Sequence, residues 1–240
     1  ETAMEEIGIK ETLDTLVAMT QAQIGYEIQK SLQNFLKKDK NVYIILTRVL
    51  VDHNDPAFSN PTKPIGPLYG EEEATKLMNE NGYVMKKVVM GSKVGYRRVV
   101  PSPQPKEILE LELIKKLSDQ GIVICCGGGG IPVIYENGKI KGIEAVIDKD
   151  LASSILASSL KFDRLIIATN IEKVKLNFMT KDEKDLDEIN INEAKKYLLE
   201  GHFHEGSMKP KILACIDFLE KGGKEAIITS TSKIIDALYG

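Results

Sequence analysis

The chain has 240 residues, of which 42% are hydrophobic and 28% are charged, and its formal net charge is −3. These values are typical of a globular protein with one large domain, or with one domain and a lobe. The small negative charge gives no electrostatic reason to expect binding to nucleic acid or to an anionic membrane surface. No apolar run approaches the roughly 20 residues that span a bilayer. The three cysteines are a poor disulfide framework, so we expect a reducing, cytoplasmic location.

Residues 10–38 are predicted to form an amphipathic helix, because apolar side chains recur there at three- and four-residue spacings. Gly25 interrupts this pattern at a cost in helix propensity, which indicates close packing or a ligand on that face of the helix. Three polar residues lie near this glycine, Gln21, Gln23 and Tyr26. A solvated helix face is the simpler interpretation of all three, and contact with a ligand is the alternative.

A proline-rich segment, residues 52–105, follows a predicted strand at 41–51. It holds seven of the nine prolines in the chain, and proline removes a backbone donor and biases the preceding residue toward extended geometry. The segment is therefore not a plain strand–helix–strand unit, and we predict a small protruding lobe that acts as a lid. A short helix at 71–81 and a hairpin of 83–89 with 96–100 are expected within it.

Basic residues of this lobe are candidates for binding an anion. Lys63 lies between Pro61 and Pro64, and a lysine on a rigid segment loses less freedom on binding than one on a loose loop. Arg97 and Arg98 are suited to a phosphate or a carboxylate, although a structural ion pair is an equally good interpretation.

Four consecutive glycines follow a predicted buried strand at 121–126. They are Gly127, Gly128, Gly129 and Gly130. Residues without a Cβ atom let the backbone turn sharply and present consecutive N–H groups to an anion. In open α/β sheets, ligands collect at the carboxyl ends of the strands. The glycine turn is therefore a candidate cradle for a phosphate or a substrate, and a flexible turn is the alternative.

The remaining sequence alternates between helical and extended patterns. Helices are expected at 105–120, 149–161, 191–200 and 209–221, strands at 131–135, 164–169 and 225–230, and a solvated loop at 178–190. Strands that alternate with helices of this length indicate an α/β fold, in which helices cover both faces of a mostly parallel sheet.

Two further segments place lysines at the start of predicted helices, Asp148-Lys149-Asp150 and Gly206-Ser-Met-Lys-Pro-Lys211. A lysine in the first turn opposes the helix dipole, and an anion bound at the same helix end would account for it. Phosphoryl transfer needs cations around the moving group and an acidic residue to orient them. Either lysine alone is explained by surface solvation, but both together with the glycine turn favour phosphoryl transfer. No Gly-x-x-x-x-Gly-Lys-Ser/Thr motif is present, so the chain is not a P-loop enzyme.

Seven stretches carry a resemblance to a known family, residues 18–26, 51–67, 95–105, 126–133, 144–152, 206–211 and 226–230. Taken together and in this order, they resemble the carbamate kinases of the amino-acid kinase superfamily. The proline-rich lobe combined with the tetraglycine turn is what marks carbamate kinases within that superfamily. The resemblance implies a three-layer αβα sandwich formed by residues 1–51 and 106–240, a lid subdomain at 52–105, and a homodimer.

The resemblance also implies an activity, the reversible Mg²⁺-dependent transfer of a phosphoryl group between ATP and carbamate. The products are ADP and carbamoyl phosphate, and the family often runs the reaction backwards to make ATP at the end of arginine fermentation. No nucleic-acid or membrane partner is expected.

The family's catalytic positions fall on Lys63, Asp150, Lys149 and Lys211. By this resemblance, Lys149 and Lys211 bridge the phosphates, and Asp150 orients these two lysines. Lys63 reaches the reacting phosphates when the lid closes. The implied nucleotide-binding residues are Asp148, Ser207 and Met208, together with Gly127, Gly128, Gly129 and Gly130 at the carbamate and γ-phosphate end.

The chain departs from the family in one respect. Two family loops, Gly-Gly-Asn and His-Gly-Asn-Gly-Pro-Gln, precede the first helix in carbamate kinases and are not in this sequence. Because these loops supply backbone donors to the phosphoryl group and the carbamate, we expect the 240 residues by themselves to be inactive. We favour an incomplete part of a normal enzyme, and the alternative is a truncated, inactive protein that serves as a dimeric binding module. The proline-rich lobe argues against another amino-acid kinase.

The histidines and cysteines give weaker signals. His202 and His204 are two residues apart with no third ligand nearby in sequence, so no zinc site is expected. Cys125 and Cys126 are expected to pack as small apolar residues.

Overall fold

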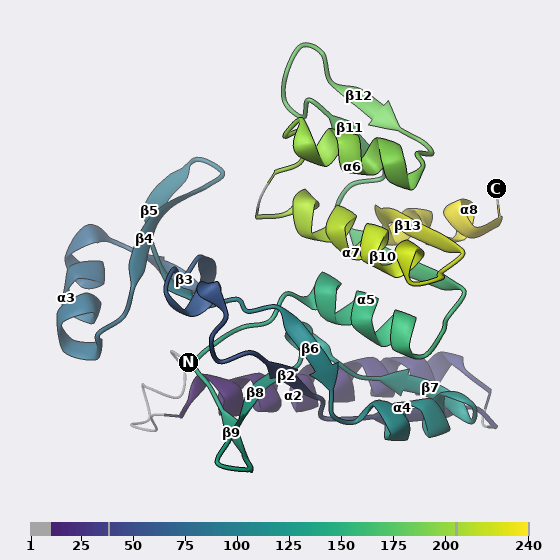
Figure 1. Cartoon of the computed structure of the whole chain (residues 1–240), viewed down its shortest axis with the longest axis horizontal. Helices are drawn as coiled ribbons and strands as arrows, with labels where there is room; N and C mark the ends of the chain where they lie inside the picture. Colours follow the sequence, from purple (N-terminus) through teal and green to yellow (C-terminus); the bar gives the residue numbers. More distant parts are fainter. Residues whose placement is uncertain (1–10, 38, 205, 240) are drawn as a thin grey trace. The chain divides into compact units, whose positions relative to one another are not determined.

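A computed structural model of the chain describes residues 11–37, 39–204 and 206–239. The chain divides into two compact units, Glu1–Asp148 and Lys149–Gly240, and their elements are labelled in Figure 1. We call them the first and the second unit. Among the described residues, no helix combines the length and the apolar character that a membrane crossing requires.

The first unit begins with α2 (Leu13–Phe35), the long purple helix of Figure 1. The predicted termini of this helix, residues 10 and 38, lie outside the described residues. A Cβ atom on Gly25 would lie 2.9 Å from Cγ2 of Ile44, so α2 packs closely against β1 (Asn41–Ile44). Close packing is therefore the reason for a glycine at this position of the helix.

Parallel strand pairs form the body of the first unit. β1 pairs with β7 (Gly121–Ile124), and β2 (Arg48–Val51) pairs with β8 (Ile131–Glu136). The β9 strand (Lys139–Gly142) returns antiparallel to β8 through the turn that Asn137 and Gly138 make. The prediction of one strand over 41–51 was wrong, because the chain leaves β1 after Ile44 and enters a different sheet at β2.

The predicted helix at 105–120 was wrong at its start. Residues Pro105–Ile108 form β6, which runs antiparallel to β2, and only Leu111–Ser118 form a helix, α4. β6 is one of the two outer strands of the sheet β6-β2-β8-β9. Proline lacks a backbone N–H, and the first residue of an outer strand is a place where that loss is tolerated. The proline that suggested a helix start therefore begins a strand.

The proline-rich segment contains a small sheet of its own. Strands β3 (Lys63–Tyr69), β5 (Lys93–Val100) and β4 (Met85–Met90) are antiparallel neighbours, and α3 (Glu71–Asn81) connects β3 to β4. The predicted helix and hairpin are confirmed, whereas β3 was not predicted because three of its residues are unfavourable in strands, two prolines and a glycine. The division at 52–105 and the role of a lid stay predictions.

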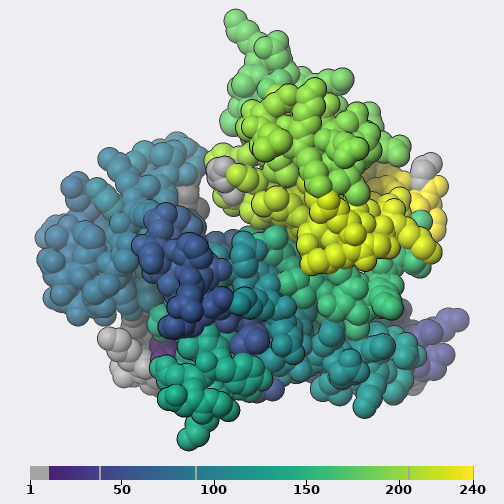
Figure 2. All heavy atoms as spheres, viewed as in Figure 1, coloured from purple at the N-terminus to yellow at the C-terminus, as the bar shows by residue number. Residues whose placement is uncertain are grey.

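The second unit is built around two parallel strands, β10 (Arg164–Thr169) and β13 (Glu225–Ser230). Its helices are α5 (Lys149–Ser159), α6 (Ile191–Leu199), α7 (Met208–Glu220) and α8 (Ile234–Tyr239). Residues 178–190 are not entirely a loop as predicted, because β12 (Lys184–Leu186) pairs with β11 (Val174–Leu176). Figure 2 shows the tip of this hairpin standing out from the rest of the unit.

Helix α7 is the central element of the second unit. Its Ala214, Cys215 and Phe218 belong to one apolar cluster, with Leu165 and Ile167 of β10. Its other side contributes to a second cluster around β11 and α6, through Ile212 and Ile216. A helix that is apolar on two sides is buried on both, so both apolar clusters depend on α7.

Phe218 tests this packing. The Phe218→Ala variant is expected to lower the free energy of unfolding by about 3–5 kcal/mol, because its fully buried ring would leave a cavity. Urea denaturation measures the change. The matched control is Phe35→Ala, which removes a ring that is 90% exposed and should change stability by less than about 0.5 kcal/mol. Equal stability losses in the two variants would contradict the packing described.

Candidate functional site

The tetraglycine turn adopts a backbone that only glycine allows. Gly128, Gly129 and Gly130 have φ values of 67°, 104° and 94°, in the left-handed region. A Cβ atom on Gly129 would lie 2.2 Å from the carbonyl oxygen of Ile147, and one on Gly130 would lie 2.2 Å from Cγ2 of Val49. Gly127 and Gly128 are exposed, whereas Gly129 and Gly130 are buried. The turn therefore packs tightly on one side and leaves its first two residues open to solvent.

The side chain of Thr47 stabilises the start of this turn. Its fully buried hydroxyl accepts the backbone N–H of Cys126 at 2.9 Å and donates to the carbonyl of Ile45 at 2.9 Å. The carbonyl oxygen of Thr47 accepts the N–H of Ile131 at 2.8 Å, just after the last glycine. One residue thus binds the chain on both sides of the four glycines.

Gln21 of α2 fixes Thr47 in turn. The side-chain oxygen of Gln21 accepts the Thr47 N–H at 2.9 Å, and its amide nitrogen donates to the Thr47 carbonyl at 3.3 Å. Gln21 is buried, so the prediction of a solvated face was wrong for this residue. A buried amide of this kind is retained only when its polar atoms have partners.

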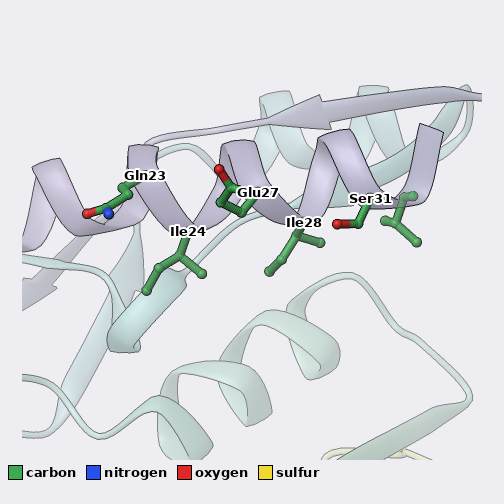
Figure 3. A pocket seen from close by; sticks show the side chains of 6 residues that line it. Gln23, Ile24, Glu27, Ile28 and Ser31 are labelled. Atoms are coloured by element: carbon green, nitrogen blue, oxygen red, sulfur yellow. The ribbon is translucent and has the colours of Figure 1, made fainter. Parts of the chain in front are cut away.

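Part of the predicted apolar stripe of α2 is left uncovered by the rest of the described chain. Ile24 and Ile28 are exposed, and with Gln23, Glu27, Ser31 and Leu32 they line a hollow along the helix. Figure 3 shows these side chains extending from one side of α2. The hollow contains none of the predicted site residues.

Lys63 and Asp148, which the sequence assigned to different motifs, are brought together in the first unit. The Nζ atom of Lys63 lies 2.8 Å from Oδ2 of Asp148. Lys63 is the first residue of β3 in the proline-rich segment, and Asp148 is the last residue of the unit. The ion pair joins the proline-rich segment to the last residue of the first unit.

Asp150 pairs with both predicted catalytic lysines of the second unit. Its Oδ2 atom lies 2.7 Å from Nζ of Lys211, and its carboxylate lies 3.4 Å from Nζ of Lys149. The Asp150 side chain is 6% exposed and that of Lys211 is 10% exposed, whereas that of Lys149 is 61% exposed. The cluster therefore holds one buried lysine and one that reaches solvent.

The helix starts explain how this cluster forms. Asp150 stands in the first turn of α5, where its charge suits the helix dipole. Lys211 lies in the first turn of α7, and this turn contains no acidic residue. Breaking a buried ion pair leaves an uncompensated charge, so Asp150 and Lys211 depend on each other.

Ser207 and Met208, the predicted nucleotide-binding residues, lie at the beginning of α7. Ser207 is the N-cap, and its hydroxyl makes no cap hydrogen bond and lies 3.3 Å from Nδ1 of His204. Met208 is half-buried against the apolar cluster around α6. The structure thus places both on the helix that carries Lys211, and their predicted role is untested.

The three cysteines differ in their surroundings. The thiol of Cys126 donates to the sulfur of Cys125, which lowers the pKa of Cys125 and raises the pKa of Cys126. Burial raises the pKa of Cys215, next to Asp150 and Lys211, to about 12. Cys126 and Cys215 are buried as small apolar residues, as expected for Cys126, and Cys125 is half-buried.

Sequence reasoning missed Gln21 and Thr47 as parts of the site. One signal was present: Gln21 lies four residues before Gly25, on the same side of α2. Gly25 faces β1, and Gln21, one turn earlier on that side, is buried as well. Nothing comparable marked Thr47.

Comparisons with known proteins identify the class of the chain. Residues 15–230 match the amino acid kinase family. The chain therefore belongs to the amino acid kinase family, and the family resemblance of its motifs is confirmed.

The relatives within this family are carbamate kinases. The chain is 50% identical over 232 residues to the carbamate kinase of Pyrococcus furiosus, which covers 95% of this chain and 73% of that protein. It is 48% identical over 237 residues to that of Thermoplasma acidophilum, covering 97% and 76%. The structure of the Giardia lamblia carbamate kinase bound to AMP-PNP superposes with a TM-score of 0.88 at 42% identity, covering 100% of this chain and 76% of that one. The α/β fold is thus the amino-acid kinase fold.

Thr47→Val tests the support of the glycine turn. Valine keeps the shape of the side chain but leaves the Cys126 N–H without an acceptor, which is expected to cost about 1–3 kcal/mol of stability. Urea denaturation gives the stability, and amide hydrogen exchange at Cys126 should become faster. Thr47→Ser keeps the hydroxyl and is the matched control. Equal exchange at Cys126 in the two variants would show that the Thr47 hydroxyl does not hold the start of the turn.

The pKa differences predict the order in which the thiols react. The thiolate is the nucleophile, so at about pH 8 Cys125 is expected to be alkylated first and Cys215 to stay unmodified in the folded protein. Digestion and mass spectrometry after timed iodoacetamide treatment locate the labels. Raising the pH should speed the labelling of Cys215 only as the pH nears its raised pKa. Early labelling of Cys215 would contradict its burial.

Proposed function

We propose that this protein is a carbamate kinase, which transfers a phosphoryl group reversibly between ATP and carbamate. The observation that carries the proposal is the cluster of Lys149, Asp150 and Lys211 at the first turns of α5 and α7. The relatives at 48–50% identity, named carbamate kinase, support it.

The cluster offers the charges that the reaction needs. In the direction of ATP synthesis, an oxygen of the ADP β-phosphate attacks the phosphorus of carbamoyl phosphate. The bond between phosphorus and the carbamate oxygen breaks, and carbamate leaves with the electron pair. No proton has to move at the phosphorus, so catalysis consists of positioning and of stabilising negative charge. Lys149 and Lys211 supply that stabilisation, and Asp150 keeps their ammonium groups in place.

The first unit contributes the remaining groups of the proposal. The exposed amides of Gly127 and Gly128 bind the carbamate and γ-phosphate end, since a turn of this kind presents N–H groups to anions. Lys63 exchanges its partner Asp148 for a phosphate when the proline-rich lobe closes as a lid. Excluding water suits a small, labile anion such as carbamate. Ser207, Met208 and Asp148 bind the nucleotide.

Mg²⁺ belongs to the proposal as part of the nucleotide substrate. Mg²⁺ keeps several water ligands and binds proteins through one or two carboxylates together with substrate phosphates. The carboxylates of Asp148 and Asp150 are paired with Lys63 and with Lys211, so the phosphates of the nucleotide are the expected ligands of this Mg²⁺. Bound Mg²⁺ would neutralise phosphate charge, and the chain's own contribution remains the lysines.

The setting of the enzyme follows from the same proposal. We place it in the cytoplasm as a homodimer that makes ATP at the end of arginine fermentation. The rival reading is an inactive carbamate-kinase-like protein that binds as a dimeric module. It predicts a stable dimer without phosphoryl transfer.

The test measures ATP formation by the protein as its gene encodes it. Carbamoyl phosphate, glutamyl phosphate and a nucleoside diphosphate are offered side by side with Mg·ADP, and only carbamoyl phosphate is expected to give ATP rapidly. Lys211→Ala is expected to lower kcat by about 10²–10³-fold, because it removes a preorganised charge from the transition state.

Lys195→Ala is the matched control, since it breaks an ion pair with Glu220 at the surface of the same unit. That variant should keep its activity. Equal rates for Lys211→Ala and Lys195→Ala would contradict the assignment of the site. Failure of all three phosphoryl donors would favour the inactive module.

A further inference from the structure

The interface between α5 and α7 includes small side chains next to the Asp150–Lys211 ion pair. On α5, Asp150 and Ser154 are four residues apart and therefore lie on one face of the helix. On α7, Lys211 and Ala214 share the facing side. Ser154 and Ala214 are fully buried, and side chains of their size let two helices approach closely.

Two polar contacts cross this interface. The first is the ion pair of Asp150 with Lys211. In the second, the Ser154 hydroxyl donates to Oδ2 of Asp217 at 2.7 Å. Asp217 is 40% exposed and also pairs with Lys221 at the surface. The second contact connects the buried interface to solvent through Asp217.

The Ser154–Asp217 hydrogen bond restricts movements of α7 along α5 that the Asp150–Lys211 ion pair alone would allow. Lysine has a flexible four-carbon stem, so one ion pair does not fix the helix that carries it. Ser154 lies four residues beyond Asp150 and Asp217 lies six beyond Lys211, which corresponds to about 6 Å and 9 Å along the helix axes. Serine and aspartate have short side chains, so a slide of α7 along α5 would break the Ser154–Asp217 hydrogen bond even where the lysine stem could follow.

We propose that Ser154 and Asp217 are positioning residues for Lys211, and this inference rests on the proposed function. They hold the first turn of α7 so that the Lys211 ammonium stands where negative charge develops. Their hydrogen bond acts through Lys211 and touches no substrate. A displacement of about 1 Å at a reacting group can cost up to about 10²-fold in rate.

Ser154→Ala tests the proposal. Asp217 keeps Lys221 and solvent as partners, so the fold should survive. The expected result is a kcat about 10-fold lower in ATP synthesis, with the KM for Mg·ADP nearly unchanged. Ser158→Ala is the matched control on the same helix, because in the described part of the chain the Ser158 hydroxyl has no hydrogen-bond partner. Its kcat should equal that of the unaltered protein.

A double-mutant cycle separates positioning from general destabilisation. In a Lys211→Ala background, Ser154→Ala is expected to cause no further loss of kcat, because the group it positions is gone. Asp217→Ala removes the acceptor of the same hydrogen bond and should lower kcat as much as Ser154→Ala does. Asp217→Asn should keep most of the kcat, because its amide oxygen still accepts the Ser154 hydroxyl. These two variants keep the test open if Ser154→Ala fails to fold.

The outcomes distinguish this inference from the proposed function. A further 10-fold loss of kcat in the Lys211→Ala background, or full activity of Ser154→Ala and Asp217→Ala, would overturn the positioning role alone. If the unaltered protein makes no ATP, or if Lys211→Ala is fully active, the proposed function fails and the inference falls with it.

Discussion

The buried ion pair between Asp150 and Lys211 is the interaction on which the account depends. Transferring a lysine and an aspartate from water to the protein interior is costly, and their attraction offsets this cost only in good geometry. A hydrophobic pair of similar volume would give comparable stability, so the fold alone does not explain two charges here. The proposed binding of phosphate would explain them, because the lysine lies at a helix start where a cation is otherwise unfavourable. Lys149, the exposed partner of Asp150, adds a second ammonium that an incoming anion can reach.

In the first unit, neutral polar groups instead of charges support the tetraglycine turn. Three glycines of the turn have positive φ, and the N–H groups of Gly129 and Gly130 bond to carbonyls within the turn. Further support comes from residues outside the turn. Thr47 and Gln21 supply this support through buried hydrogen bonds in which the polar groups of both residues have partners. Buried polar networks of this kind rigidify a structure when every member is paired. In both units, the residues with proposed chemistry thus stand on a second set of residues that hold them.

The residues with proposed chemistry were easier to predict from the sequence than the residues that hold them in place. The glycine run and the helix-start lysines were predictable because their residue types are unfavourable unless a turn or an anion requires them. Thr47 and Ser154 were not, because serine and threonine are common everywhere and their role depends on which helix or strand packs against them. The same holds for β1 and β2, which read as one β-branched run although the chain changes sheets between them. Local pattern specifies what a segment can form, and tertiary packing decides how it is used.

Nitrogen-15 NMR of the lysine ammonium groups tests the central claim most directly. The protein as its gene encodes it is labelled at lysine Nζ, and signals are assigned with single Lys→Arg variants. The account predicts that Mg·ADP with carbamoyl phosphate shifts the resonances of Lys149 and Lys211, that adenosine leaves them in place, and that Lys195 responds to neither. Unchanged Lys149 and Lys211 signals at saturating Mg·ADP and carbamoyl phosphate would contradict it.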